Sequence, residues 1–155
     1  MSDLHTYLQD HLAGATFGVN LLKDLSEQKV DKELAALAAK LVAEVQLDRE
    51  TLDRIVNSLG EESSALKDAG AWVAQKLGRT KLSTTEPFGV FEAVELMTLG
   101  VSGKIALWKT LAEIPRLETT VSVDQLKALI AQAEQQFDQL ECFRLRMAKS
   151  LFRSL

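Results

Sequence analysis

Apolar residues recur every three or four positions along most of the chain, which is the spacing of a buried stripe on an α-helix. No segment has the alternation of apolar and polar residues between tight turns that is typical of β-strands. The pattern therefore predicts an all-α fold. The predicted helices cover about Asp3–Gln28, Lys32–Leu59, Ser64–Leu77, Pro87–Ile114, and a last segment that begins after Pro115 and runs nearly to Leu155.

Residues that favour helix ends flank these segments. Gly60 follows the second helix, where a residue in the left-handed conformation commonly ends a helix. Hydroxyl residues at 83–85, followed by Pro87, predict the start of the helix that runs to Ile114. The other predicted caps are Ser2 or Asp3, Asp31, and Ser122 with Gln125 as a capping box.

The lengths of the connections predict how the long helices are arranged. The first two long helices, and the last two, are joined by short connections, and such neighbours lie antiparallel. A long connection with its own short helix separates the two hairpins. This order is that of a ferritin-like bundle rather than of a simple up-down bundle. We expect one domain over residues 1–155, a ferritin-like antiparallel four-helix bundle whose long crossover carries a short extra helix.

Composition excludes several classes of protein. The 155 residues are 46% apolar and 26% charged, which is typical of one globular domain. The net charge of −4 argues against a general nucleic-acid binder. A single cysteine, Cys142, excludes an intrachain disulfide framework and a cysteine-based metal centre. No apolar run of the length needed to cross a membrane is present. We expect a cytoplasmic protein without nucleic-acid or membrane partners.

Polar residues fall on stripes that the periodicity reserves for apolar residues. Hairpins that turn near residue 29 or 30 and near residue 118 place these residues at one level of the bundle. Buried carboxylates are costly unless they are paired, hydrogen-bonded or bound to a metal. His5, in the first turn, is instead expected to be solvated. The predicted buried polar cluster consists of His11, Glu44, Asp48, Glu92, Glu95, Glu141 and Arg144.

The helix predicted over Pro87–Ile114 is apolar on two sides, so it should be buried on two sides. The cover for its second side comes either from the same chain or from a second copy, and we expect a homodimer. The residues of this dimer or extra packing face are Val90, Val94, Met97, Val101 and Trp108.

Glycines also lie inside the predicted helices, where each costs about 1 kcal/mol relative to alanine. They are Gly14, Gly18, Gly100 and Gly103. Close packing of helices explains such glycines, and an open space for a ligand beside them is the alternative.

A family resemblance rests on three stretches that together span most of the chain: LQDHLAGATFGVNLL, ALKDAGAWVAQKLGRTKL and EAVELMTLGVSGKIALWKTL. With these stretches the chain resembles a small family of uncharacterised bacterial ferritin-like proteins. The resemblance implies the ferritin-like fold and assigns no activity. In the wider class, Glu residues and two Glu-x-x-His motifs often hold two iron or manganese ions.

Neither Glu-x-x-His motif is present in this chain. The second long helix has Glu44-x-x-Leu47 or Asp48-x-x-Thr51 instead, and the last helix has Glu134-x-x-Phe137 or Glu141-x-x-Arg144. Leucine and phenylalanine cannot bind a metal, and an arginine repels one.

We therefore expect Arg144, with a protonated His11, to supply the positive charge that metals supply elsewhere. The carboxylates Asp48, Glu92, Glu95 and Glu141 would then form ion pairs, and Arg144→Leu would strongly destabilise the fold.

The chain is accordingly expected to be a metal-free, non-catalytic protein without a cofactor that binds another protein or a small ligand. No arrangement of a nucleophile and a histidine base indicates an enzyme. The alternative is a carboxylate-rich iron or manganese site, in an oxidoreductase or an iron-handling protein. Its ligands would come from His11, Glu44, Asp48, Glu95, Glu134 and Glu141.

Overall fold

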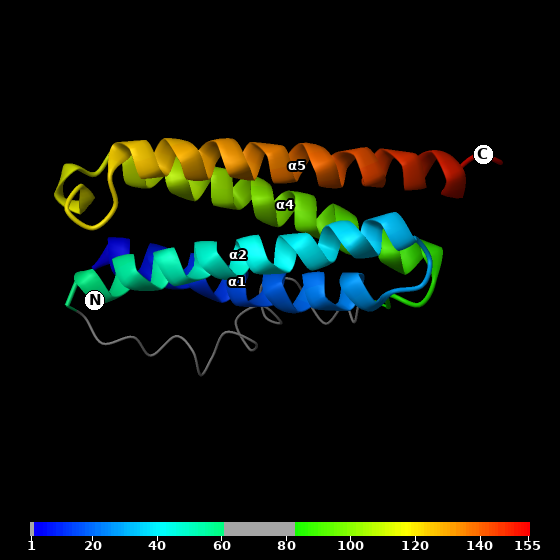
Figure 1. Cartoon of the computed structure of the whole chain (residues 1–155), viewed down its shortest axis with the longest axis horizontal. Coiled ribbons are helices and arrows are strands. Elements are labelled where there is room, and N and C mark those ends of the chain that lie inside the picture. The colour runs from blue at the N-terminus through cyan, green and yellow to red at the C-terminus, as the bar shows by residue number, and fades with distance from the viewer. Residues whose placement is uncertain (1, 61–82) are drawn as a thin grey trace.

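The computed structural model describes residues 2–60 and 83–155, and these residues form helices and turns without a strand. This confirms the all-α prediction for the described part of the chain. The helix predicted over 64–77 lies outside it. The elements are α1 (Asp3–Glu27), α2 (Lys32–Ser58), α4 (Pro87–Ala112), the short 3-10 helix η1 (Pro115–Leu117) and α5 (Val123–Leu151), as Figure 1 shows.

The helix ends lie close to their predicted positions because local capping contacts fix them. The Ser2 hydroxyl accepts a hydrogen bond from the His5 N–H at 3.2 Å, and Asp31 Oδ1 accepts one from the Leu34 N–H at 3.0 Å. At the start of α5, both bonds of the capping box between Ser122 and Gln125 are present.

The end of α2 agrees with its predicted cap, whereas the start of α4 does not. Gly60 has a positive φ of 72°, as its place after α2 predicts. The start of α4 differs from the expected hydroxyl cap. Glu86 is the residue at the N-cap, and its side chain makes no capping bond. The hydroxyls of Ser83 and Thr85 bond each other at 2.8 Å instead, and Pro87 starts the helix without needing an N–H partner.

Contacts between helices give their directions. A hydrogen bond of 3.4 Å joins the Tyr7 hydroxyl to Thr110, while Gly18 lies beside Met97, so α1 and α4 are antiparallel. Each helix of the pairs α1–α2 and α4–α5 is antiparallel to its partner, and α4 therefore runs parallel to α2. It follows that α4 begins at the end of the bundle opposite to the end where α2 stops (Figure 1).

The core runs along the whole length of the bundle and includes the second apolar side of α4. The five residues of the predicted dimer or extra packing face are each at most 5% exposed within a single chain. The second apolar side of α4 is therefore covered within the same chain, which is one of the two possibilities that the sequence allows. The homodimer stays a prediction. None of the described helices is long and apolar enough to cross a lipid bilayer.

Candidate functional site

Four polar side chains from three helices meet inside the bundle, and we call them the central polar network: Glu44, Asp48, Lys104 and Gln136. The Lys104 ammonium donates to Asp48 Oδ2 at 2.6 Å and to Gln136 Oε1 at 2.5 Å. The Gln136 amide in turn donates to Glu44 Oε2 at 2.8 Å. The network therefore links α2, α4 and α5 at one level of the bundle.

Burial sets the electrostatics of this network. The side chains of Asp48 and Lys104 are only 5% and 14% exposed. Burial raises the pKa of Asp48 above its ordinary value, and the nearby Lys104 ammonium offsets part of this effect. A buried carboxylate needs such a partner, so the ammonium compensates the charge of Asp48 within the protein.

The cation at the centre differs from the one expected from the sequence. Lys104 occupies the position predicted for Arg144, and neither Lys104 nor Gln136 belonged to the predicted cluster. Because α4 is apolar on most of its sides, the spacing of its apolar residues does not define one buried side. The sequence therefore does not indicate that Lys104 is buried. Gln136 carries no charge, so it is not among the charged residues of the stripes. Its spacing from Ala133 and Leu140 nevertheless places it on the buried stripe of α5, and an amide at such a position is a signal of a buried polar partner.

Arg144 lies nearer the surface, at the edge between α4 and α5, with its side chain 24% exposed. It donates to both oxygens of Glu141, at 2.7 and 2.6 Å, and to Glu95 at 3.2 Å. The hydrogen bond with Arg144 lowers the pKa of Glu141, and the same bond raises the pKa of Arg144. The predicted closeness of Glu95 and Glu141 is therefore found, outside the centre of the bundle.

The remaining predicted residues do not join these groups. Glu92 is half-buried and makes no hydrogen bond or ion pair with a described residue, and Glu134 is exposed. Burial lowers the pKa of His11, with a smaller opposing effect of Asp10, so its imidazole is neutral at pH 7 rather than protonated as expected. Across residues 2–60 and 83–155, no three His, Cys, Asp or Glu side chains are grouped as a metal site.

His5 also differs from its expected solvated position, since it is only 1% exposed. It lies three residues before Leu8 and shares the buried side of α1. Its ring Nε2 is 3.1 Å from the Gln9 amide nitrogen, which can only donate. His5 is therefore a buried residue of the helix start.

A pocket of about 390 Å³ adjoins the central polar network and lies among α1, α2 and α4. Such a volume is in the range of small-molecule sites. Gly14 on α1 and Gly100 and Gly103 on α4 line it, and a Cβ atom added at any of the three would meet nothing within 4 Å. Of the two explanations for the glycines, open space is found at these three, whereas a Cβ atom at Gly18, the fourth, would lie 3.8 Å from Met97 Cε.

Most of the pocket wall formed by described residues is apolar, and its charged side chains come from α1, α2 and α4. Asp48 and Lys104 both line the pocket, as does His11, whose ring meets that of Tyr7 edge-on at 4.7 Å between centroids. Arg49 also lines it and donates from Nε to the Thr16 hydroxyl at 2.9 Å. The arrangement can hold an apolar molecule beside a compensated pair of charges.

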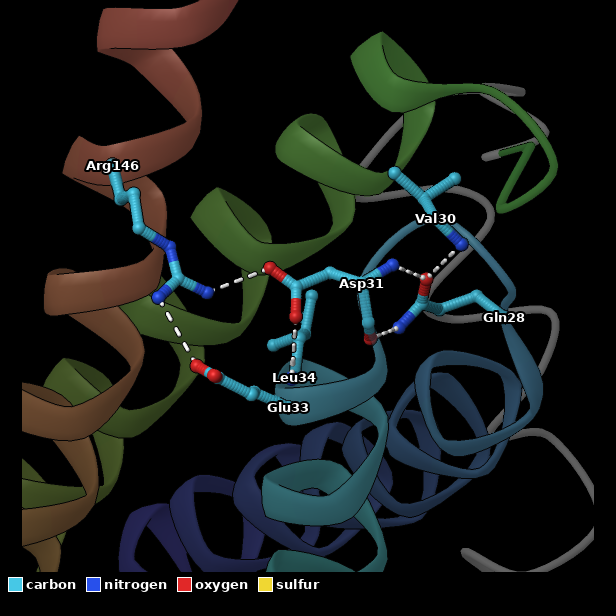
Figure 2. Close-up of polar contacts among 6 residues, drawn as sticks. All are labelled: Gln28, Val30, Asp31, Glu33, Leu34 and Arg146. Carbon is cyan, nitrogen blue, oxygen red and sulfur yellow. Dashed lines mark hydrogen bonds and ion pairs between the residues drawn. The ribbon is translucent and has the colours of Figure 1, made fainter.

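A second group of charges, the end cluster, consists of Asp31, Glu33 and Arg146 and joins the α1–α2 turn to α5 (Figure 2). Arg146 donates to Asp31 Oδ2 at 2.7 Å and to Glu33 Oε2 at 3.2 Å. Burial raises the pKa of Asp31, but the hydrogen bonds from the Leu34 N–H and Arg146 outweigh it, so the pKa lies below its ordinary value.

The turn beside the end cluster is held by one buried amide. Gln28 accepts from the N–H groups of Val30 and Asp31, at 2.7 and 2.9 Å, and donates to the Asp31 carbonyl at 2.6 Å (Figure 2). This amide satisfies three backbone groups between α1 and α2 and so positions the Asp31 cap.

Comparison of the chain with protein-family models, with curated proteins and with solved structures finds no match. Functional inference therefore depends on the pocket and its neighbouring charges.

Proposed function

We propose that this chain is a non-catalytic binding protein with a ferritin-like arrangement of helices, and that it binds one small, mainly apolar molecule in the pocket among α1, α2 and α4. The observation that carries the proposal is the pocket itself, which has an apolar wall and a volume of about 390 Å³.

The directions of the helices support the ferritin-like part of this proposal. Because α2 and α4 are parallel, the end of α2 and the start of α4 lie at opposite ends of the bundle. These positions are the ones expected of a bundle with one long crossover, and they support the proposal. They agree with the resemblance carried by the three sequence stretches.

The central polar network supports binding in preference to metal chemistry. Lys104 already compensates Asp48 at 2.6 Å, and a divalent cation there would meet the repulsion of the ammonium. Glu44 is engaged by Gln136 and by Lys40, the latter at 3.7 Å.

The glycines in the wall support a binding role for the pocket. An alanine at Gly14, Gly100 or Gly103 would meet no neighbour and would favour the helix by about 1 kcal/mol. Glycine at these positions lowers helix stability and leaves space, which is the balance expected where function needs the space.

A variant that fills the pocket tests the proposal. Gly103→Leu places a side chain in open space at the wall, so it should leave the fold at least as stable and weaken the binding of 2-methylnaphthalene about tenfold or more. Binding is measured by isothermal titration calorimetry, and stability by urea unfolding.

Ser102→Leu is the matched control, because Ser102 is an exposed neighbour on α4 that does not line the pocket. It adds the same side chain to the same helix and should leave the affinity unchanged. Absence of measurable binding to the parent protein, or equal binding by the parent and the Gly103→Leu variant, would contradict the proposed function.

A further inference from the structure

We propose that the pocket selects an uncharged molecule with an apolar body and one hydroxyl or amide head group, and that Asp48 and Lys104 bind this head group together. The inference rests on the proposed function and adds the chemical class of the ligand. It is based on the hydrogen-bonding groups of Asp48 and Lys104 that other described residues do not use.

The pair has both a donor and an acceptor to offer. An ammonium has three N–H donors, and Lys104 uses two of them, on Asp48 Oδ2 and on Gln136. No described residue donates to the other carboxylate oxygen of Asp48, although the residue is only 4% exposed. Both residues line the pocket, so the pair can offer a ligand there one N–H and one carboxylate oxygen.

A hydroxyl or a primary amide matches this pair because each accepts and donates a hydrogen bond. A hydrocarbon offers neither bond. A carboxylate could accept from Lys104 but could give nothing to Asp48, and its negative charge would lie beside that of Asp48. The pair therefore favours a head group that does both and carries no charge.

The charges around the pocket support a neutral ligand. Among the residues that the structure describes, its lining holds two acidic ones, Asp10 and Asp48, and two basic ones, Arg49 and Lys104. His11 adds no charge at neutral pH because burial lowers its pKa. With the charges balanced, neither an anion nor a cation gains from the site as a whole.

The rest of the wall determines the body of the ligand. Leu52, Met97 and Leu107 line the pocket, and the three open glycines add no polar side chain. Such a surface contributes affinity through apolar burial, and in this proposal the Asp48–Lys104 pair orients the ligand.

Probes that share one body and differ in the head group test the inference on the parent protein. We would measure the calorimetric affinities of 2-methylnaphthalene, 2-naphthalenemethanol, 2-naphthamide and 2-naphthoate at pH 7. The alcohol and the amide are expected to bind about tenfold more tightly than the hydrocarbon, the difference that one net hydrogen bond to a charged group supplies. The carboxylate should bind more weakly than the alcohol.

A double variant, Asp48→Leu with Lys104→Met, removes both partners of the head group while avoiding a lone buried charge. It should bind the hydrocarbon and lose the preference for the alcohol, so that the two affinities differ by less than about twofold. The matched control, Glu95→Leu with Arg144→Met, removes an ion pair that does not line the pocket and should keep the preference.

The outcomes separate the inference from the function on which it rests. Equal binding of the hydrocarbon and the alcohol, blocked in both cases by Gly103→Leu, would retain the pocket as a binding site and overturn the head-group assignment. Tightest binding of the carboxylate would also overturn it, because Lys104 would then act as an anion receptor. Failure of every probe to bind would overturn the proposed function together with the inference.

Discussion

The central polar network and the end cluster contain nearly the same bond in two different environments. Lys104 lies 2.6 Å from an oxygen of Asp48, and Arg146 lies 2.7 Å from an oxygen of Asp31. The first pair has side chains 5% and 14% exposed, whereas Arg146 is 52% exposed. Distance alone therefore does not distinguish the two pairs, and burial does.

The two aspartates respond to these environments in opposite directions. Burial raises the pKa of Asp48 despite its lysine partner. At Asp31, burial also raises the pKa, but backbone and arginine hydrogen bonds lower it further than burial raises it. An ion pair inside this bundle therefore mainly relieves the penalty of burying a charge, whereas the one at its end adds a modest gain in stability.

The largest expected effect is that of breaking the central pair. Lys104→Met leaves the Asp48 carboxylate buried without its cation and removes a partner of Gln136. We expect a loss of about 3–5 kcal/mol in the free energy of unfolding, because an uncompensated charge then remains in the core. Urea unfolding at pH 7 measures this loss.

The double variant that removes both charges serves as the control. If the pair mainly relieves a penalty, Asp48→Leu combined with Lys104→Met recovers most of the stability that Lys104→Met loses. Equal stability of the single variant and the parent would contradict the view of the network as a buried, coupled unit.

Helix ends could be predicted from the sequence because local chemistry determines them. Asp31, Ser122 and Gln125 make their capping bonds within three residues of their own positions, and Gly60 adopts its left-handed conformation without a distant partner. Contacts this short in sequence can be inferred from spacing alone. The positions of α1, α2 and α5 along the chain followed from the same reasoning.

The identity of the central partners could not be predicted in the same way. Lys104 bonds residues 56 and 32 positions away in the sequence. The residues of α4 are apolar on most sides of the helix, so the sequence does not show that the Lys104 side chain points into the bundle. Arg144 fits the buried stripe of α5 by periodicity, yet its long side chain reaches Glu95 at the edge of the bundle. Which of two long cations points inward depends on packing between helices, and periodicity within one helix does not specify that packing.

A smaller effect is expected at the end cluster. Asp31→Ala removes the cap of α2 and the partner of Arg146, and the loss of the cap is expected to lower the free energy of unfolding by about 1 kcal/mol. Asp31→Asn keeps an oxygen that can cap Leu34, so it should lose much less. A loss for Asp31→Ala as large as that for Lys104→Met would show that the two regions do not differ as described.

A still smaller effect is expected for Arg144→Leu, in contrast to the strong destabilisation predicted from the sequence. Its partner Glu95 is 48% exposed, so both carboxylates that it contacts can regain water when the arginine is removed. Thermal unfolding of this variant and of Lys104→Met in the same buffer compares the two. A similar fall in Tm for both variants would restore Arg144 to the role first expected of it.

The smallest effect is the acid dependence of the end cluster. The pKa of Asp31 in the folded protein lies below its ordinary value of 3.8. The folded state therefore binds the proton less readily than the unfolded state, so the carboxylate contributes stability that is present above the unfolded pKa and is lost as the pH falls through the folded pKa. Asp48 has the opposite sign, because its raised pKa lets the folded state take up a proton more readily.

Urea unfolding of the parent and of Asp31→Asn from about pH 6 down to about pH 2 measures the Asp31 contribution alone, because all other titrating groups are shared. The stability advantage of the parent should be constant near neutral pH and should shrink below about pH 4 as Asp31 takes up its proton. An advantage that stayed constant through acid would mean that the carboxylate charge adds nothing at the end cluster. In that case the two regions would differ only in the penalty that Lys104 relieves at the centre.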